Sequence, residues 1–358
     1  MADKLRVGVI FGGRSAEHDI SVMSAKNILS LLSRAKYKVV PIGITREGNC
    51  LLVEDVARAI KKLERDRKLS FQDVIPSENI FPSEKIFSFI KQDIDLIFPV
   101  LHGRNGEDGT LQGVCELADV PYVGSGVMAS ALAMDKAATK KILSAHHIPV
   151  VKAQVVARRR WEDSPEEVIK YVSDEIKYPC FVKPVNTGSS IGISKVQHQE
   201  ELKEALAAAA LHDRQLLIET AVEGREIEVA VLGNETPQAS VPGEIVTTRP
   251  FYDYEAKYTD GCAQLSIPAD LPARTTEKMQ KFALQAFQAL DCAGMARVDF
   301  FLSRSGKIYV NEINTIPGFT SFSMYPQLWE KTGIDGESLV DKLIELAMER
   351  YREKTYVK

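Results

Sequence analysis

The stretch 5–32 constrains the fold of this chain more than any other part of the sequence. An apolar run from Leu5 to Phe11 is followed by Gly12 and Gly13, and then by a helical pattern that begins near Asp19 or Ser21. The apolar stretches KVVPIGIT and DLIFPVLHG come later, with helical patterns between the strands. This alternation predicts an α/β fold with a Rossmann-like open parallel sheet, whose ligands lie beyond the carboxyl ends of the strands.

The length of 358 residues exceeds one ordinary hydrophobic core and predicts several domains. Changes in pattern suggest the units 1–133, 134–222 and 223–358, with a weakly patterned insertion over 51–91. The later elements that we expect are a helix ending before Pro149, the strands AQVVA, CFVKPV, QLLIET and REIEVAVLG, helices over 200–210, 277–290 and 336–354, and a hairpin over 295–313.

Composition excludes some functions. A formal net charge of -4 offers no global attraction for nucleic acid or an anionic membrane. The 5 cysteines are widely spaced and include no C-x-x-C pair, which favours buried free thiols in a reducing compartment. The sequence shows neither a signal-peptide pattern nor an apolar run long enough to span a bilayer, so a cytoplasmic location is expected.

Polar side chains interrupt two apolar strands near the carboxyl end of the chain. The stretches MARVDFFLS and KIYVNEIN flank the tripeptide RSG, which is typical of a hairpin turn. Because strand side chains alternate between faces, one face of this hairpin carries Arg297, Asp299, Glu312 and Asn314. Pairing of Leu302 with Lys307 would set Arg297 opposite Glu312 and Asp299 opposite Val310, and a slip of one residue would undo this arrangement.

The residue types on this face favour a hard cation. Asp299, Glu312 and Asn314 offer oxygen ligands without histidine or cysteine, a set that suits Mg²⁺ together with substrate phosphates. The alternative is a cross-strand ion pair between Arg297 and Glu312 on a solvated face. The apolar neighbours favour the metal, because an unpaired carboxylate is costly to bury among them.

Two further stretches are consistent with a nucleotide site. Lys183 ends an apolar strand, and the loop 186–192 is rich in glycine and serine, so its backbone N–H groups can approach phosphate closely. This loop lacks the order of a Walker A motif and could also be a plain turn. Glu219 ends one strand and Glu226 begins the next, so they could hold a base and a ribose; they could also be surface acids beside a solvated linker.

The order of these features resembles the ATP-grasp architecture. The resemblance rests on Lys136, Lys183, the GSSIG loop, Glu219 with Glu226, Arg297, Asp299 and the N-E-I-N-T-x-P-G run. More narrowly, GGRSAEHDIS, LHGRNGEDGTLQG, YDYEAKY and NEINTIPGFTSFSMYP resemble D-alanine:D-alanine ligases, from Val7 to Leu346. The resemblance implies a three-domain ATP-grasp fold.

It also implies a nucleotide and metal site. Lys136 and Lys183 would contact the phosphates, Glu219 and the backbone near Val222 the adenine, and Glu226 the ribose, with Ser190 and Lys257 completing the nucleotide contacts. Asp299, Glu312 and Asn314 would ligate Mg²⁺ or Mn²⁺, as two ions.

The substrate residues follow from the same resemblance. The residues that would contact the first D-alanine or its oxyanion are Glu17, His102, Arg297 and the Gly318 N–H, while Ser323 and Met324 would form the pocket for the second. Glu17, Ser189 and Tyr258 would form a hydrogen-bonded triad, with Tyr258 in a lid that excludes water. For Glu17 the alternative is a carboxylate stabilised by the dipole of the helix that follows.

The implied reaction joins two D-alanines for peptidoglycan precursors. The first carboxylate attacks the γ-phosphate of ATP, and the amine of the second D-alanine attacks the resulting acylphosphate. Ligases that make D-alanyl-D-lactate or D-alanyl-D-serine remain alternatives, as does a catalytically silent ATP-binding regulatory protein. The resemblance further implies small-molecule substrates and a homodimer.

Overall fold

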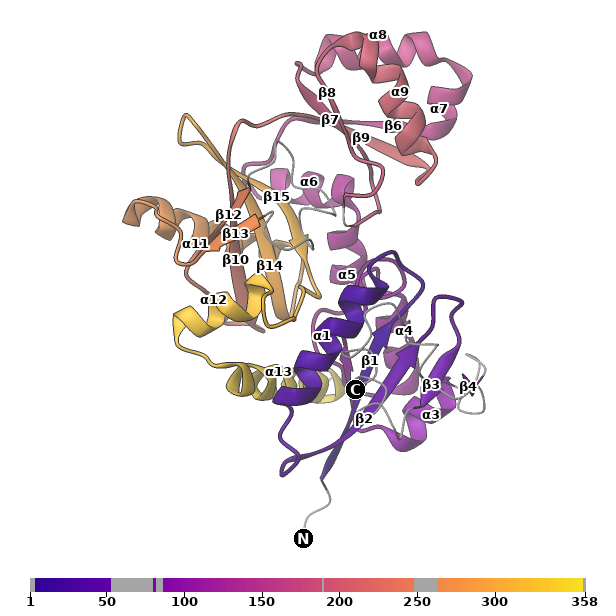
Figure 1. Ribbon diagram of the computed structural model, residues 1–358, viewed down its shortest axis with the longest axis vertical. Coiled ribbons are helices and arrows are strands. Elements are labelled where there is room, and N and C mark those ends of the chain that lie inside the picture. Colours follow the sequence, from indigo (N-terminus) through magenta and orange to yellow (C-terminus); the bar gives the residue numbers. More distant parts are fainter. Residues whose placement is uncertain (1–3, 53–79, 82–85, 189, 248–262, 357–358) are drawn as a thin grey trace.

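The computed structural model describes residues 4–52, 80–81, 86–188, 190–247 and 263–356. These residues form three β-sheets that follow one another along the chain. Figure 1 shows the sheet with β6–β9 at one end of the elongated molecule and the amino-terminal sheet at the other, with the sheet that contains β10, β14 and β15 between them. The predicted α/β class is therefore confirmed.

The amino-terminal sheet has the strand order β4-β3-β2-β1-β5. Its strands are β1 (Leu5–Gly12), β2 (Tyr37–Ile44), β3 (Cys50–Leu52), β4 (Ile80–Phe81) and β5 (Leu96–Pro99). β1 pairs in parallel with β2 and β5, as predicted, whereas β3 and β4 extend the sheet in antiparallel fashion. The weakly patterned insertion over 51–91 includes the end of β3, all of β4 and the start of a helix at Ile86, and 53–79 and 82–85 lie outside the described residues.

Helices cover both faces of this sheet. On one face, Val7, Val9 and Phe11 of β1 share a core with α1 (His18–Leu31) and α13 (Gly336–Tyr356). On the other face, Ile10 and Ile42 pack against α3 (Ile86–Asp93) and α4 (Thr110–Ala118). Burial on both faces explains why β1 is an uninterrupted apolar run.

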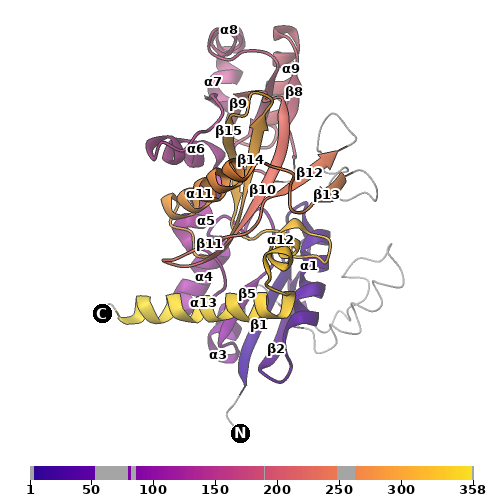
Figure 2. The ribbon, with the colours of Figure 1, turned by 90° about the vertical axis from the view of Figure 1, so that its left-hand side faces the viewer.

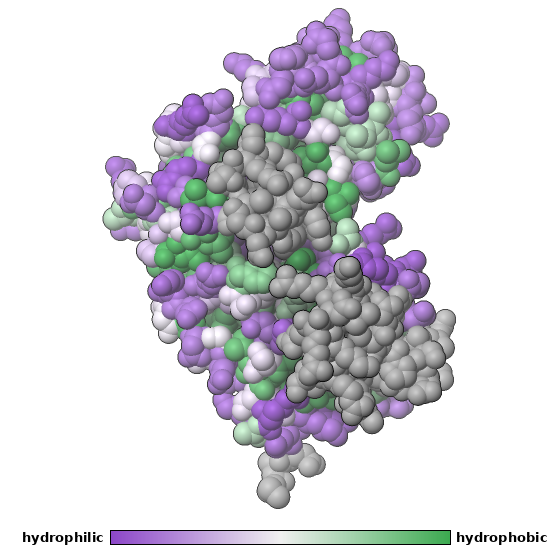
Figure 3. Space-filling view, in the orientation of Figure 1, coloured by the Kyte–Doolittle hydropathy of each residue, from purple (hydrophilic) through white to green (hydrophobic). Residues whose placement is uncertain are grey.

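The second sheet is antiparallel, with the order β6-β9-β7-β8. Its strands are β6 (Ala153–Ala157), β7 (Cys180–Pro184), β8 (Ser194–Val196) and β9 (Gln215–Thr220). The helices α7 (Arg158–Asp163), α8 (Pro165–Glu175) and α9 (Gln199–Ala210) cover one face with the buried side chains of Trp161, Val168 and Leu202 among others. The outer surface over these helices is largely hydrophilic in the view of Figure 3.

The third sheet has the order β13-β12-β10-β14-β15, with β11 paired to β10. Its strands are β10 (Gly224–Gly233), β11 (Gln238–Ala239), β12 (Gly243–Thr247), β13 (Ala263–Ser266), β14 (Gly294–Ser303) and β15 (Ile308–Asn314). α11 (Ala273–Ala289) packs on one face, where Val229, Val298 and Ile313 are buried. α11 begins four residues before the predicted helix over 277–290, directly after Pro272.

Within the described residues, α5 (Val127–Met134), α6 (Lys136–Ala145), α12 (Met324–Thr332) and α13 connect the sheets. α12 and α13 pack between the amino-terminal sheet and the third sheet, as Figure 2 shows for α13. α5 and α6 contribute Ala129 and Leu143 to the core of the third sheet. Near its start, α6 also places Ala137 against Val185 and Leu217 of the second sheet. α6 is therefore fixed to both sheets that flank the pocket described below.

Two expectations from composition can be compared with the described residues. Cys50, Cys115, Cys180 and Cys292 are buried free thiols, as predicted, and Cys262 lies outside the described residues. None of the helices in the described ranges is long and apolar enough to cross a membrane.

Candidate active site

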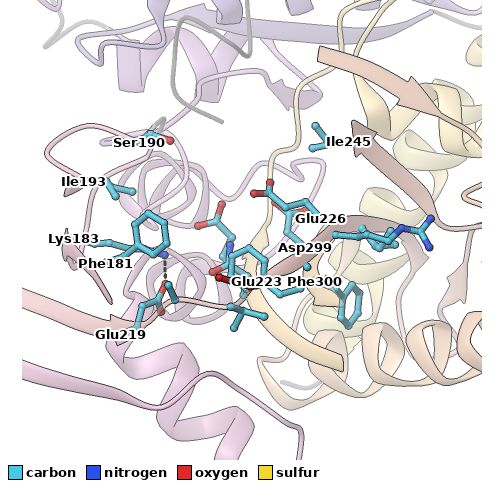
Figure 4. Close-up of a pocket in the computed structure, with 18 of the residues that line it drawn as sticks. Phe181, Lys183, Ser190, Ile193, Glu219, Glu223, Glu226, Ile245, Asp299 and Phe300 are labelled. Carbon is cyan, nitrogen blue, oxygen red and sulfur yellow. Dashed lines mark ion pairs between the residues drawn. The ribbon is translucent and has the colours of Figure 1, made fainter. Parts of the chain in front are cut away.

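A pocket of about 560 Å³ lies between the second and third sheets. One wall comes from β7, β8 and β9 and includes Lys183 and Glu219, while β10, β12, β14 and β15 supply the opposite wall with Glu226 and Asp299. Figure 4 shows these side chains on the two sides of the pocket. Predicted site residues that line the pocket are Lys136, Lys183, Ser190, Glu219, Val222, Glu226, Asp299 and Glu312.

Strand pairing explains the charged wall. Phe181 lies opposite Glu219 in the β7–β9 ladder, and Lys183 is two residues beyond Phe181, so all three side chains project from one face. Their neighbours Val182 and Ile218 point into the core on the other face. The sheet therefore presents an aromatic ring and two opposite charges to the pocket.

Glu219 is almost completely buried, with an exposed fraction of 2%. Its carboxylate forms ion pairs with Lys183 and with Lys140, whose Nζ lies 3.0 Å from Glu219 Oε2. Burial acts to raise the pKa of Glu219, but the charges of the two lysines outweigh it and lower that pKa to about 2. Glu219 is therefore ionised at neutral pH and available only as a hydrogen-bond acceptor.

Lys136 connects the glycine-rich loop with the hairpin. It is the first residue of α6, whose amino end is capped by Asp135 through a 2.8 Å hydrogen bond from Ala138 N to Asp135 Oδ1. Lys136 Nζ donates to Thr187 O at 2.7 Å and lies 3.7 Å from Glu312 Oε2. A fixed cation thus stands where the loop approaches the acidic hairpin.

Apolar side chains complete the pocket. Phe181, Ile193, Val222 and Ile245 line it together with the polar groups. Figure 4 shows Phe181 and Ile193 on the side of Lys183, and Ile245 on the side of Glu226. Walls of this kind, with a few convergent polar groups, suit a flat heteroaromatic ring with a charged extension.

The polar face of the hairpin forms as predicted, but through a different register. Leu302 pairs with Ile308 instead of Lys307, a slip of one residue that alone would turn Glu312 toward the core. A β-bulge between Asp299 and Phe300 compensates, because β15 has one additional residue there, Asn311. Asp299 consequently lies opposite Glu312 and Arg297 opposite Asn314, while Val310, expected opposite Asp299, is buried opposite Phe300.

Arg297 holds the acidic groups of this face together. Its Nε donates to Asp299 Oδ1 at 2.7 Å and its Nη2 to Asp299 Oδ2 at 2.8 Å. The same Nε lies 2.9 Å from Glu228 Oε2 on the neighbouring strand β10. Burial acts to lower the pKa of Arg297, but the charges of Asp299 and Glu228 outweigh it and raise that pKa. The alternative interpretation set Arg297 against Glu312 across the strands, whereas in the structure Arg297 forms ion pairs with Asp299 and Glu228.

The residues predicted to bind metal fit a divalent cation that also contacts phosphate. Within the described ranges, no group of three or more histidine, cysteine, aspartate or glutamate side chains is arranged to hold an ion. Asp299 and Glu312 nevertheless lie opposite each other and line the pocket. Asn314 Nδ2 donates to Asp299 Oδ2 at 2.9 Å, so its oxygen would ligate only after the amide turns over. Two carboxylates and one amide suit Mg²⁺ that takes its remaining ligands from phosphate and water.

Glu17 lies where two glycine loops meet. It precedes α1 as the N-cap residue, yet its side chain makes no capping hydrogen bond. A Cβ atom added to Gly103 would lie 2.6 Å from Glu17 Oε2, and one added to Gly188 would lie 2.9 Å from the same oxygen. The carboxylate therefore touches a loop of the amino-terminal unit and the glycine-rich loop of the second sheet, which favours a role in the site over helix capping.

His102 fixes the loop that follows β15. This histidine has an exposed fraction of 5%, and its Nδ1 donates to Ile316 O at 3.0 Å. Its Nε2 lies 3.3 Å from Ser24 Oγ, and Ser24 Oγ accepts from Phe319 N at 3.1 Å. Burial lowers the pKa of His102, so the ring is neutral at pH 7 and its Nε2 accepts the serine hydroxyl. His102 thus acts on the loop that carries Gly318.

Glu107 supports the same loop and was not identified from the sequence. Its Oε2 accepts from Gly103 N at 2.7 Å, and its Oε1 accepts from Ile316 N at 3.2 Å. Burial, together with the charge of Glu17, raises the pKa of Glu107 to about 8. A carboxyl group of Glu107 therefore connects the loop beside Glu17 to the loop that contains Gly318.

The residues predicted for the second substrate lie just beyond this loop. Ser323 Oγ accepts from Thr320 N at 3.0 Å and lies 2.6 Å from Thr320 Oγ1. A Cβ atom on Gly318 would lie 3.1 Å from Ser323 Oγ, so Ser323 is a direct neighbour of the Gly318 backbone. The side chain of Met324 is buried in the core, with its sulfur against Gly243. Only backbone or edge contacts of Met324 could therefore reach a substrate.

Three predicted residues, Ser189, Lys257 and Tyr258, lie outside the described residues. The residues that sequence reasoning missed are Lys140, Glu228 and Glu107. Two of them carried a signal: Lys140 follows Lys136 by four residues on a helix, and Glu228 follows Glu226 by two on a strand, which in each case gives a common face. Glu107 is connected to the site only by the folding of its loop.

Known families and proteins match this chain over its length. The model for the D-ala D-ala ligase N-terminus matches residues 6–125, and the model for the C-terminus of the same ligases matches residues 142–345. A D-alanine--D-alanine ligase of Acetivibrio thermocellus is 47% identical and covers 99% of this chain and 98% of its own length. One from Halothermothrix orenii is 46% identical, over 97% of this chain and 99% of its own length.

Solved structures give the same picture. The D-alanine-D-alanine ligase from Coxiella burnetii superposes with a TM-score of 0.82 and 38% identity, over 99% of this chain and 97% of the other. The VanG D-Ala:D-Ser ligase from Enterococcus faecalis superposes with a TM-score of 0.84 and 36% identity, over 96% of this chain and 100% of the other.

Proposed function

This chain belongs to the D-alanine–D-alanine ligase family, and we propose that it joins two molecules of D-alanine while ATP is split to ADP and phosphate. The product, D-alanyl-D-alanine, serves the synthesis of peptidoglycan precursors. The observation that carries this proposal is one pocket with an ion-paired, almost fully buried Glu219 on one wall and the opposed carboxylates of Asp299 and Glu312 on the other.

The nucleotide would lie across this pocket. The adenine amino group would donate to Glu219 and the ring would contact the backbone near Val222, while Glu226 would receive the ribose hydroxyls. Its phosphates would then extend toward Lys136, Lys183 and the loop containing Ser190, where two ammonium groups and backbone N–H groups neutralise charge. Lys257 would also contact the nucleotide.

Asp299, Glu312 and Asn314 would hold Mg²⁺ or Mn²⁺, as two ions, which would orient the phosphates and neutralise charge that develops on them. The protein residues supply the rest of the positioning. Lys136 is already fixed between Thr187 O and Glu312, so its ammonium needs little reorganisation to meet a phosphate.

The first D-alanine would bind with its ammonium on Glu17. A carboxylate oxygen of this substrate then forms a bond to the γ-phosphorus while the bond to the ADP oxygen breaks. The nitrogen of the second D-alanine attacks the resulting acylphosphate, and phosphate leaves as the peptide bond forms. Arg297 and the Gly318 N–H would stabilise the oxyanion, with His102 behind the loop and Ser189 and Tyr258 closing the site with Glu17.

D-serine is a second candidate for the acceptor substrate. A D-Ala:D-Ser ligase is among the similar structures, so the architecture alone does not select the acceptor. Ser323 and Met324 would form the acceptor pocket together with the stretch 255–258. We favour D-alanine because the curated relatives at 46–47% identity are D-alanine--D-alanine ligases.

The proposal extends to the location, the oligomeric state and the domain organisation of the protein. The protein would act in the cytoplasm, where ATP and D-alanine are available, and would work as a homodimer without nucleic acid or membrane partners. Its units would be 1–133 for the first D-alanine, 134–222 for the nucleotide, and 223–358 for the metal and the lid.

The test is to incubate the purified chain with ATP, Mg²⁺ and D-alanine and to measure ADP and dipeptide together. We expect ADP and D-alanyl-D-alanine in equal amounts, and little product with L-alanine. Faster ADP release with D-alanine plus D-serine or D-lactate than with D-alanine alone would identify the alternative ligases. ATP binding without turnover on any of these substrates would support the regulatory protein instead.

A further inference from the structure

Glu219 has two cationic neighbours that differ in their access to the pocket. Lys183 and Glu219 both line the pocket, and Figure 4 marks the ion pair between them. Lys140 lies behind Glu219, on α6, and does not line the pocket. Only 8% of its side chain is exposed, and among the described residues its Nζ has no hydrogen-bond acceptor beyond this ion pair. Lys140 therefore serves Glu219 and cannot reach a ligand.

The two lysines also differ in what nucleotide binding requires of them. If the proposed function is correct, the ammonium of Lys183 moves to the phosphates and no longer neutralises Glu219. Lys140 has no such alternative, because α6 is packed against both neighbouring sheets through Ala137 and Leu143. Lys140 would then be the remaining counter-charge of a carboxylate that is almost fully buried.

We propose that Lys140 is a positioning residue that keeps Glu219 ionised and oriented once a nucleotide occupies the pocket, and that it thereby makes the site select a 6-amino purine over a 6-oxo purine. An ionised carboxylate only accepts hydrogen bonds. It pairs with the exocyclic amino group of adenine and repels the carbonyl oxygen that hypoxanthine presents at the same place. This inference rests on the proposed nucleotide site.

Loss of Lys140 would change the chemistry of the base contact. A buried carboxyl group without a counter-charge favours its protonated form, which donates a hydrogen bond as well as accepting one. The protonated form could donate to the 6-oxo group, so discrimination between the two purines would weaken. The two oxygens of Glu219 support this role, because Oε2 lies 3.0 Å from Lys140 Nζ while Oε1 pairs with Lys183. Oε1 is therefore the oxygen that becomes available to a ligand when Lys183 turns to the phosphates.

The test measures equilibrium binding of ATP and of ITP, with Mg²⁺ and without D-alanine, to the full chain and to Lys140→Met. We expect the unaltered chain to prefer ATP, and the ratio of the two dissociation constants to change about tenfold or more toward ITP in the variant, as for one charge-assisted hydrogen bond. Lys141→Met is the matched control, because Lys141 is the exposed neighbour of Lys140. Lys140→Arg keeps the charge and should largely restore the preference.

The outcomes separate the two proposals. An unaltered chain that binds no ATP would overturn the proposed function, whereas one that binds ATP and ITP equally would overturn the selective role of Glu219. Weaker binding of both nucleotides to Lys140→Met, with an unchanged ratio, would show a merely structural role and overturn the inference. If Lys140→Met does not fold, Lys140→Gln removes the same charge while retaining a polar end. The ratio of the ATP and ITP dissociation constants of that variant then decides between these outcomes.

Discussion

Arg297 binds both carboxylate oxygens of Asp299, two residues away on the same strand, at 2.7 and 2.8 Å. The guanidinium thus stands beside the carboxylate that is proposed to bind Mg²⁺. Because Glu228 lies 2.9 Å from the same guanidinium, Arg297 would keep a carboxylate partner if Asp299 turned toward a metal. Arg297 could therefore exchange Asp299 for Glu228 as its ion-pair partner and stay where it is proposed to stabilise the oxyanion of the reaction.

Asp299→Asn should abolish most phosphoryl transfer without unfolding the chain. The amide binds Mg²⁺ weakly and no longer neutralises Arg297, but Glu228 remains beside that guanidinium. We expect kcat to fall by about 10²- to 10³-fold, the usual effect of removing one preorganised charged group. ADP release measures the loss and circular dichroism checks the fold. If the variant is unfolded, its loss of activity says nothing about a catalytic role for Asp299. Near-normal turnover would contradict the assignment of Asp299 to the metal.

Glu228→Gln tests whether the second carboxylate holds Arg297. The variant should lower kcat by about tenfold or more, because an incompletely paired guanidinium no longer points at the acyl oxygen in every molecule. The affinity for ATP should change little, since Glu228 is not among the groups proposed to bind it. Glu235→Gln, an exposed position after the same strand β10, is the control. A larger effect on ATP binding than on kcat would assign Glu228 to the nucleotide.

The hairpin shows why sequence reasoning located this site but not its register. Period-2 alternation correctly grouped Arg297 with Asp299 and Glu312 with Asn314, because that rule depends only on strand geometry. Turn length and a one-residue bulge at Asn311 are set by local backbone energies that differ little between alternatives. The slip at the turn and the bulge each shift the pairing by one residue, and together they shift it by two. A shift of two residues keeps the same face, so the face was predicted correctly and the pairing was not.

Gly188→Ala should weaken binding of the first D-alanine more than it affects stability. The added methyl group would lie 2.9 Å from Glu17 Oε2, and the flexible end of Glu17 can turn away from it. We therefore expect the KM for D-alanine to rise several-fold while the melting temperature changes little. Steady-state kinetics at saturating ATP measure the effect. An unchanged KM would indicate that Glu17 does not bind the substrate ammonium.

Gly113→Ala is the matched control for that substitution. Gly113 lies inside α4, and a Cβ atom there would meet no atom within 4 Å. Alanine in a helix interior is favoured over glycine by about 0.5–1 kcal/mol, so this variant should be slightly more stable and fully active. A rise in KM in both variants would point to a general effect of loop or helix stiffening.

The parts that sequence reasoning missed depend on contacts between distant segments. The buried, paired strand β1 and the helices α9 and α13 follow directly from apolar periodicity. By contrast, Glu107 meets Ile316 across 209 positions of the chain, and Lys140 meets Glu219 across two different elements. No local pattern encodes such distances, so these groups are identified only once the sheets are packed together.

Glu107 makes a prediction about stability and pH. Its pKa of about 8 in the folded chain exceeds the ordinary value of 4.5, so between these limits the folded chain binds more protons than the unfolded chain and its stability falls as pH rises. Glu107→Gln removes this titration while retaining an acceptor for the backbone N–H groups. Calorimetry would measure the melting temperature at about pH 6 and at about pH 8.5. The drop in melting temperature between these two pH values should be smaller in the variant than in the unaltered chain. Glu353→Gln, at an exposed position, should keep the original slope, and an equal slope in Glu107→Gln would show that Glu107 is ionised throughout this range.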